Sequence, residues 1–325
     1  MQYQPPEQIG SMGDSLREAF GKALVACAPD FPNLIVLDAD VAGGTGTHHF
    51  RHAFADRFLQ MGIAEQNMMG VAAGLAAVGW LPVFTTFAVF CLRAFEQARL
   101  SVAYSGRNVK IVASHPGVDA GPDGGSVQSL EDLAAFRALP GMVVISPADA
   151  LEMEQATRAV LHYTGPVYMR SGRSPTPRIL PADYRFELGR GRVLRAGDDV
   201  LIVACGVEVA RALDAAERLY ASGIRASVVN MATIKPIDAE LLIAQAQRCG
   251  CVVTAEDHTI HGGLGAAVAE VLVQHWPCPV EFIGVGDRFG ESGEPEELAE
   301  KFQLTAQFIV HAAQRAVARK RRGAP

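Results

Sequence analysis

The chain has 325 residues, of which 49% are hydrophobic, and it carries a formal net charge of −6. This length allows about two domains with ordinary buried cores. The one basic cluster, residues 319–322, is typical of a solvated helix end rather than of a nucleic-acid-binding arm. The first ten residues lack the basic and apolar regions of a signal peptide, and no run of about 18 uncharged apolar residues predicts a membrane span. Six scattered cysteines without paired spacing indicate reduced thiols, so we expect a cytoplasmic protein.

The first half of the chain alternates short apolar runs with helical patterns. The apolar runs predict buried strands at 34–39, 82–87, 110–114, 142–146 and 167–170. The helical patterns lie near 13–27, 65–79, 90–105 and 149–163. Near-continuous apolar strands that alternate with helices predict a parallel sheet covered on both faces.

The segment 171–192, which is rich in proline, glycine and charge, interrupts this pattern and suits a crossing linker. A second alternating set follows, with strands predicted at 200–205, 226–230, 251–256 and 280–285 and helices near 207–222, 237–248, 263–274 and 304–320. We therefore predict an α/β protein with two doubly wound, mostly parallel domains. Their expected bounds are residues 12–180 and 194–325, with a linker at 181–193.

Two glycine-rich turns follow predicted strands. HGGLGAAVAEVL, residues 261–272, could bind an anion at a helix start, but glycines that permit close packing are the favoured interpretation. In LDADVAGGTGTHHF, residues 37–50, a strand ends at Asp38 and Asp40 and meets a glycine turn, so either aspartate could contact a ligand bound beyond the carboxyl end of the strand. An aspartate that merely starts a turn is the alternative.

Three histidines, His48, His49 and His52, form an HHxxH pattern. His48 and His52 would share one face of a helix, so a metal site is conceivable. Because no carboxylate or cysteine is clearly supplied as a third ligand, surface histidines are favoured.

A polar triplet, Glu65, Gln66 and Asn67, begins an otherwise apolar, small-residue helix in MGIAEQNMMGVAAGLAAVG. The positive end of the helix would favour an ionised Glu65, whereas apolar surroundings would raise its pKa. On pattern alone, an acid that caps the helix or lies in its first turn is the favoured interpretation.

That segment resembles the glutamate-bearing part of the pyrimidine-binding domain of transketolases. The resemblance continues in the same order through LDADVAGGTGT, TTFAVF, SHPGVDAGPDGGSVQSLEDLAAFRALPGMVVISPAD and GVGDRFGESGEPEELAEKFQLTA, and it spans most of residues 12–315. The chain therefore resembles the C-terminal half of a transketolase, encoded as a separate subunit. The resemblance implies a pyrimidine-binding domain followed by a transketolase C-terminal domain.

The resemblance implies thiamine diphosphate as cofactor. Glu65 matches the glutamate that hydrogen-bonds the pyrimidine N1′ and favours the imino tautomer, which then takes the proton from thiazolium C2. Phe87 and Phe90 match the aromatic stretch that packs on the pyrimidine ring. Asp40 and Ile63 also match positions at the cofactor. The implied reaction moves a two-carbon ketol unit from a ketose to an aldose.

Four further positions match the sugar channel of the family: Arg17, His115, Asp123 and Arg173. The two arginines and His115 could meet a terminal phosphate, and Asp123 could hydrogen-bond a sugar hydroxyl. Arg170 lies close enough in sequence to be confused with Arg173. The chain has Val127 where many transketolases have histidine, and Gly44 where they often have serine. These departures put the ordinary pentose-phosphate pair in doubt and allow a modified sugar or another anion, such as a sulfonate.

The sequence lacks the GDG motif that opens the metal–diphosphate site in full-length transketolases; Gly197-Asp198-Asp199 lies in the wrong context. We therefore expect no metal ligand in this chain. The expected partner is an N-terminal transketolase subunit that carries GDG and holds Mg²⁺ or Ca²⁺, in an α2β2 assembly. The second domain is expected to serve packing and association, with residues 256–263 as a structural loop.

Three other readings stay open. The beta subunit of a 2-oxoacid dehydrogenase decarboxylating component has the same size, domain order and glutamate role. The chain could also be related in function to 1-deoxyxylulose-5-phosphate synthase, or be a non-catalytic member of the family.

Overall fold

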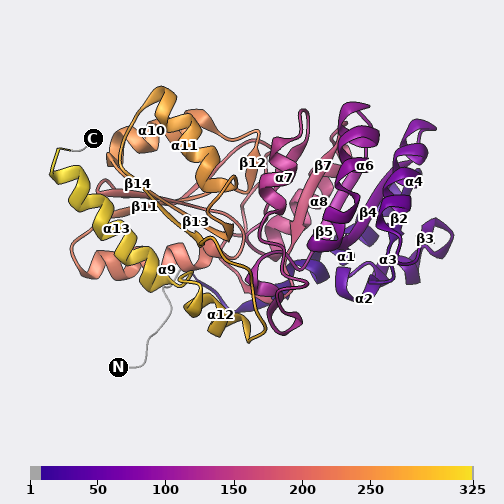
Figure 1. Cartoon of the computed structure of the whole chain (residues 1–325), viewed down its shortest axis with the longest axis horizontal. Coiled ribbons are helices and arrows are strands. Elements are labelled where there is room, and N and C mark those ends of the chain that lie inside the picture. Colours follow the sequence, from indigo (N-terminus) through magenta and orange to yellow (C-terminus); the bar gives the residue numbers. More distant parts are fainter. Residues whose placement is uncertain (1–8, 324–325) are drawn as a thin grey trace.

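The computed structural model describes residues 9–323. Residues 1–8 and 324–325 lie outside the described part. They include most of the N-terminal stretch in which no signal peptide is expected and the last two residues of the second predicted domain. The chain forms two lobes that lie side by side, each built on its own sheet (Figure 1). Within residues 9–323, no helix is both long enough and apolar enough to cross a membrane.

The first lobe contains a seven-stranded sheet in the order β12-β6-β7-β5-β4-β2-β3. All neighbouring strands are parallel except the edge pair β12 and β6. The predicted mostly parallel sheet is thus confirmed. The strands are β2 (Leu34–Asp38), β3 (Phe58–Gln60), β4 (Leu81–Phe87), β5 (Lys110–Ser114), β6 (Val143–Ile145), β7 (Val167–Ser171) and β12 (Thr233–Lys235).

Helices cover both faces of this sheet because successive residues of a strand point to opposite sides. In β2, Leu34 and Val36 pack on the side of α1 (Leu16–Cys27) and α8 (Ala150–His162). Ile35 and Leu37 pack on the side of α4 (Glu65–Ala77) and α7 (Asp132–Ala138). Both faces are therefore hydrophobic, as the near-continuous apolar strands predict.

The second lobe has a five-stranded sheet in the order β14-β13-β10-β11-β9, parallel except for the edge strand β9. Helices α9 and α13 cover one face, and α10 and α11 cover the other. The strands are β9 (Arg192–Arg195), β10 (Val200–Ala204), β11 (Ala226–Asn230), β13 (Val252–Thr259) and β14 (Val280–Val285). The helices are α9 (Glu208–Ala221), α10 (Ala239–Cys249), α11 (Leu264–His275), α12 (Pro295–Lys301) and α13 (Ala306–Arg321).

Two features tie the lobes and the linker together and were not predicted. β12, whose residues follow the second lobe's strand β11, pairs with β6 and completes the first lobe's sheet. β1 (Met12–Ser15), expected as the start of a helix, instead pairs with β8 (Pro175–Pro177), which lies in the segment 171–192 expected to be a crossing linker. The linker is therefore fixed onto the first lobe over part of its length.

The single helix predicted at 90–105 is wrong in detail. This stretch forms α5 (Ala88–Cys91), a 3₁₀ turn, α6 (Phe95–Gln97) and a π-helical segment at 98–104. Its buried residues Cys91, Ala94, Ala98 and Val102 keep a helical spacing, which is why the pattern predicted one helix. Spacing of buried residues does not reveal such changes in hydrogen-bond pitch.

Candidate active site

The candidate site lies at the carboxyl ends of the first lobe's parallel strands. The connection after β2 leads to β3 on one side, and the connection after β4 leads to β5 on the other. The strand order therefore reverses between β2 and β4, and such switch points are where open parallel sheets bind ligands. Asp40 follows β2 and Phe87 ends β4, so both flank this point.

The two candidate aspartates at the end of β2 have different surroundings. Asp38 is fully buried and accepts hydrogen bonds from the Val41 N–H (2.8 Å) and from the hydroxyls of Thr45, Thr47 and Thr85 (3.1–3.2 Å). It therefore holds the glycine turn in place. Asp40 is exposed and has a left-handed backbone, with φ 65°. Asp40 lines an open pocket together with Gly44, Phe87, Arg51 and Gln60.

Glu65 opens α4, where the helix N-terminus favours a negative charge. Its carboxylate is only 7% exposed, and its Oε1 accepts a hydrogen bond from the Arg93 guanidinium at 3.4 Å. The Arg93 side chain is 58% exposed, and its guanidinium lies 4.7 Å from the centre of the Phe90 ring. The backbone carbonyl of Arg93 accepts a hydrogen bond from the Gln66 side-chain amide. Gln66 and Asn67 are exposed rather than buried. Arg93 was not predicted as part of this site, because nothing in the order of residues shows that it faces Glu65.

Three rings form a stack beside this pair. Phe90 stacks on Phe87 with their centres 5.5 Å apart, and Phe87 stacks on His115 at 3.9 Å. Gly44 lies against the same ring, since a Cβ there would come within 2.5 Å of Phe87 Cε1. Only glycine at position 44 therefore leaves room for the Phe87 ring in its observed position.

His115 begins the part of the site that contains the charged residues Asp123 and Arg173. It is 3% exposed, and burial, followed by the charges of Arg17 and Arg173, lowers its pKa to about 3. It is consequently neutral at physiological pH. Its Nε2 lies 3.6 Å from Asp123, and Asp123 lies 3.8 Å from Arg173 Nε. Arg17 is half-buried, and its Nε has no hydrogen-bond partner among residues 9–323.

The structure separates Arg170 from Arg173. Arg170 is buried and donates hydrogen bonds to the Asp132 carboxylate from Nε (2.8 Å) and Nη2 (2.5 Å). Tyr168 donates a third hydrogen bond to the same carboxylate. Arg170 is thus committed to the protein interior, whereas the Arg173 side chain is 32% exposed.

The structure places a carboxylate, that of Glu18, beside the predicted histidine cluster. Glu18, in the first turn of α1, lies 2.8 Å from His49 Nε2, and one ligand atom from each of Glu18, His48 and His49 lies within 4.8 Å of the others. These histidines belong to α3 (His48–Ala53), and His52 is exposed. Since a hydrogen bond to His49 already accounts for the position of Glu18, we assign no metal to this group.

The glycine turn at 261–272 is filled by the protein itself. The buried Glu256 carboxylate accepts the N–H groups of Leu264 and Gly265, both at 2.7 Å. An internal carboxylate therefore takes the place that an external anion would occupy at the start of α11. The packing interpretation holds, because a Cβ on Gly263 would overlap this carboxylate.

Six side chains thus form one continuous row across the edge of the sheet: Glu65, Arg93, Phe90, Phe87, His115 and Asp123, with Arg173 beyond them. Asp40 lines the pocket beside Phe87. Ile63 stands apart, 75% exposed on the approach to α4. All six cysteines lie in the described part and are free, as the sequence predicts.

Comparison with known proteins identifies the class. Residues 14–178 match the transketolase pyrimidine binding domain, and residues 189–309 match the transketolase C-terminal domain. The chain belongs to the transketolase family. Within that family it corresponds to the C-terminal half that some organisms encode as a separate subunit, which confirms the resemblance seen in the sequence.

Three relatives support this placement. The 6-deoxy-6-sulfo-D-fructose transketolase subunit SqwH of Clostridium sp. is 43% identical over 306 residues, covering 94% of this chain and 95% of that protein. A putative transketolase C-terminal section of Methanocaldococcus jannaschii is 44% identical, covering 93% and 96%. A solved split-gene transketolase, described as an inactive β4 tetramer, is 52% identical with a TM-score of 0.89, covering 95% of this chain and all of that one.

Proposed function

We propose that this chain is the C-terminal subunit of a thiamine diphosphate-dependent transketolase, which moves a two-carbon ketol unit between anionic sugars. The row from Glu65 to Arg173 is the observation that carries the proposal. It combines a buried carboxylate, stacked rings and a cationic end along one edge of the sheet. A non-catalytic relative would have no need to keep this combination.

The residues present fit the pyrimidine ring of the cofactor. Arg93 is planar, donates an N–H to Glu65 and lies over Phe90. A protonated aminopyrimidine is also planar, and it would make the same two contacts. We infer that the ring takes the place of the Arg93 guanidinium, held by Glu65, Phe87 and Phe90, with Asp40 and Ile63 at its margins.

The cofactor, when bound, supplies the nucleophilic carbon that breaks and makes the carbon–carbon bond. The residues of this chain would bind and orient the ring and control its protonation. Glu65, which is buried at the start of α4, would accept an N–H from the ring nitrogen, and its burial would keep water from competing for that contact. Phe87 and Phe90 present flat surfaces that would set the plane of the ring. A Glu65→Gln change would keep the volume and remove the carboxylate.

The cationic end suits the terminal anion of a sugar. Arg17 has a buried N–H without a partner among residues 9–323, and Arg173 is partly exposed. Guanidinium groups bind such anions well. His115 is neutral and can donate or accept a hydrogen bond, while Asp123 can accept one from a hydroxyl.

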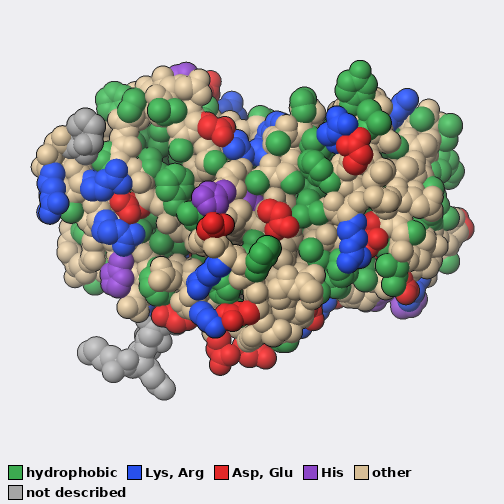
Figure 2. Space-filling view, viewed as in Figure 1, with side chains coloured by type: hydrophobic (Ala, Val, Ile, Leu, Met, Phe, Trp, Pro, Cys, Tyr) green, Lys and Arg blue, Asp and Glu red, His purple; other side chains and the backbone are tan. Residues whose placement is uncertain are grey.

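A partner subunit is expected to complete the site. The outer side of α4 is small and open: Gly70 and Gly74 have nothing within 4 Å of an added Cβ, and Val78 is 75% exposed. Exposed hydrophobic side chains are visible over the end of the first lobe where α4 and α6 lie (Figure 2). The exposed large hydrophobic residues Trp80, Leu100 and Tyr104 belong to the segments that follow α4 and α6. We infer that this face meets an N-terminal subunit with the GDG motif, which would hold Mg²⁺ or Ca²⁺ and the diphosphate, in an α2β2 enzyme.

The test is reconstitution. The chain alone, with thiamine diphosphate and Mg²⁺, is expected to show no ketol transfer, and addition of a GDG-bearing partner is expected to restore it. The 52% identical split-gene protein, described as inactive in its β4 form, agrees with this expectation. Substantial turnover by the chain alone would end the partner claim. Turnover of a 2-oxoacid with transfer to a lipoyl protein would instead identify a 2-oxoacid dehydrogenase subunit.

A sulfonated sugar is a second candidate substrate. The 43% identical relative is a 6-deoxy-6-sulfo-D-fructose transketolase subunit. Gly44 has no hydroxyl to offer a phosphate, and the Phe87 ring leaves no room for one. Assays of the reconstituted enzyme with xylulose 5-phosphate and with a 6-sulfonated ketose would decide between them, since efficient turnover of the phosphate pair alone would exclude the sulfonate.

A further inference from the structure

The loop at residues 115–129, here called the sugar loop, carries His115 and Asp123. It contains four residues with positive φ: His115 (57°), Gly117 (71°), Gly121 (66°) and Gly124 (80°). The loop contains a 3₁₀ segment at Val118–Asp123 that is interrupted at Gly121, and the Gly117 N–H bonds to Ser129 O at 2.8 Å, so internal hydrogen bonds define its shape only in part. Its shape therefore depends on the surfaces that hold it.

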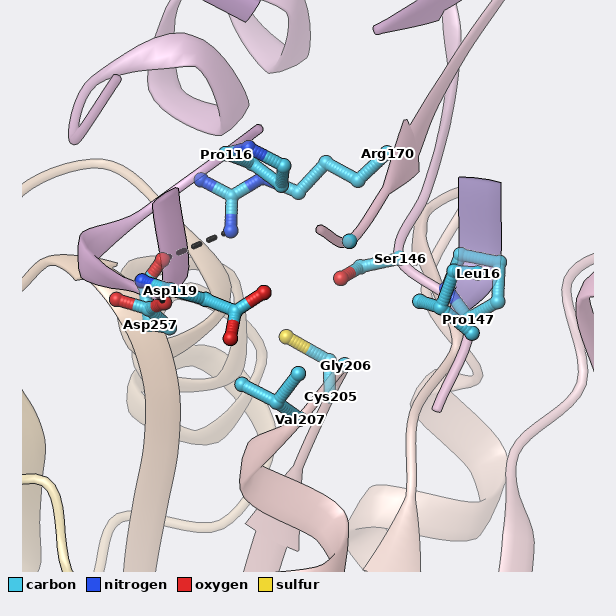
Figure 3. A pocket seen from close by; sticks show the side chains of 11 residues that line it. Leu16, Pro116, Asp119, Ser146, Pro147, Arg170, Cys205, Gly206, Val207 and Asp257 are labelled. Atoms are coloured by element: carbon cyan, nitrogen blue, oxygen red, sulfur yellow. Dashed lines mark hydrogen bonds between the residues drawn. The ribbon is translucent and has the colours of Figure 1, made fainter. Parts of the chain in front are cut away.

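The second lobe holds the start of this loop through one carboxylate. Asp257, on β13, is 5% exposed; its Oδ1 accepts the Val118 N–H (2.9 Å) and its Oδ2 accepts the Asp119 N–H (3.1 Å). Gly117 lies so close that a Cβ there would overlap this carboxylate. Arg170 donates to the Asp257 carbonyl at 2.8 Å and so fixes the strand beneath (Figure 3).

Asp119 passes this constraint to the arginine end of the site. Its Oδ2 accepts the N–H groups of both Arg173 and Ser174, each at 3.1 Å. Asp257 and Asp119 lie next to one another at the boundary between the lobes (Figure 3). The cavity that they line with Arg170 and Cys205 has a volume of ≈20 Å³. That is room for about one water molecule, so the boundary is closely packed.

A second tie holds the far end of the loop. Gln128 Nε2 donates to Gly121 O (3.1 Å) and to Glu291 O (2.9 Å), and Glu291 belongs to the second lobe. A Cβ on Gly125 would come within 2.5 Å of Gly290 O. The second lobe therefore contacts the sugar loop on both sides of Asp123.

We propose that Asp257 is a positioning residue for sugar binding, through which the C-terminal domain sets the places of His115, Asp123 and Arg173. The proposal rests on the proposed transketolase function. It gives this domain a role beyond packing and association, because the groups expected to meet the sugar are placed from across the lobe boundary.

The two carboxylates predict different responses to the same change. Asp257 uses both oxygens, so the amide in Asp257→Asn keeps one contact and turns its NH₂ toward a backbone N–H. Asp119 uses a single oxygen for both contacts, so Asp119→Asn can keep them. In the reconstituted enzyme we expect Asp257→Asn to raise the KM for ketose and aldose by about 10- to 100-fold, the range for a lost charge-assisted hydrogen bond, and Asp119→Asn to stay within about threefold.

Glu152→Gln is the matched control. Glu152 is also a fully buried carboxylate at the lobe boundary, but it accepts from Ala148, Tyr184 and Asn230 and does not touch the sugar loop. We expect its sugar KM and its affinity for thiamine diphosphate to match those of the wild type, even where its melting temperature falls as far as that of Asp257→Asn. The affinity of Asp257→Asn for the cofactor should also stay within about twofold.

Hydrogen exchange separates failure of the proposal from failure of the proposed function. In the assembled protein, Asp257→Asn is expected to speed amide exchange at 117–129 and at 173–174, and Glu152→Gln is not. This readout works whether or not the enzyme turns over sugars. Unchanged exchange and KM in Asp257→Asn, or equal effects in Asp119→Asn, would overturn the proposal. If Asp257→Asn does not fold, Asp119→Ala replaces it, with faster exchange at 173–174 and a raised sugar KM as the expected result.

Discussion

Replacement of Arg93 by methionine tests whether its guanidinium occupies the place of the cofactor ring. The ion pair with Glu65 contributes about 0.5 kcal/mol, a low value because Arg93 is 58% exposed and therefore screened by solvent. Its position over Phe90 adds about 0.5–1 kcal/mol. A ring that displaces Arg93 must overcome about 1–1.5 kcal/mol, so Arg93→Met should tighten the apparent Kd for thiamine diphosphate by about 5- to 12-fold.

The assay is a thiamine diphosphate titration of the reconstituted enzyme, followed by activity and by protein fluorescence. Arg99→Met is the control, because Arg99 is similarly exposed and pairs only with Glu96 among the described residues. Its affinity for the cofactor should not change. Weaker cofactor binding in Arg93→Met, with Arg99→Met unchanged, would refute the reasoning and show that Arg93 stays in the site as a contact.

Three further changes have defined outcomes. Glu65→Gln should lower kcat of the reconstituted enzyme by about 10²- to 10⁴-fold with unchanged circular dichroism, as expected for loss of a proton-handling group; a kcat within tenfold of the wild type would contradict its role. Gly44→Ser should cost about 1–3 kcal/mol in urea unfolding because its Cβ meets the Phe87 ring, whereas Gly43→Ser, which faces open space, should cost under about 1 kcal/mol. Burial lowers the pKa of His258 from 6.5 to about 4. Because the unfolded chain therefore binds more protons in that pH range, the free energy of unfolding should fall as pH drops from 6.5 to 4. His258→Gln should reduce the slope of the free energy of unfolding against pH, and an identical slope would contradict the assignment.

The sheets were predictable because their strands are apolar on both sides. LIVLD at 34–38 sends alternate residues into two hydrophobic layers, and that pattern needs no knowledge of the rest of the chain. β12 carries no such signal. It has three residues, and it is a strand only because the edge of β6 lies beside it in space.

The candidate site was partly predictable for the same reason. Asp40 and Phe87 follow apolar strands, so their place at the carboxyl edge follows from the parallel order. Arg93 and Asp257 could not be found in this way. Arg93 reaches Glu65 across 28 positions, and Asp257 reaches Val118 across 139 positions, so only the packing of helices and lobes reveals either contact.

The pairing of β12 with the first lobe's sheet affects how this subunit unfolds. A lobe that lends an edge strand to its neighbour cannot melt without exposing that neighbour's backbone, and one hydrophobic cluster already continues from α4 to α11. Heating should therefore give a single cooperative transition rather than two, and expression of residues 1–190 alone should leave a bare edge on β6 that invites intermolecular pairing.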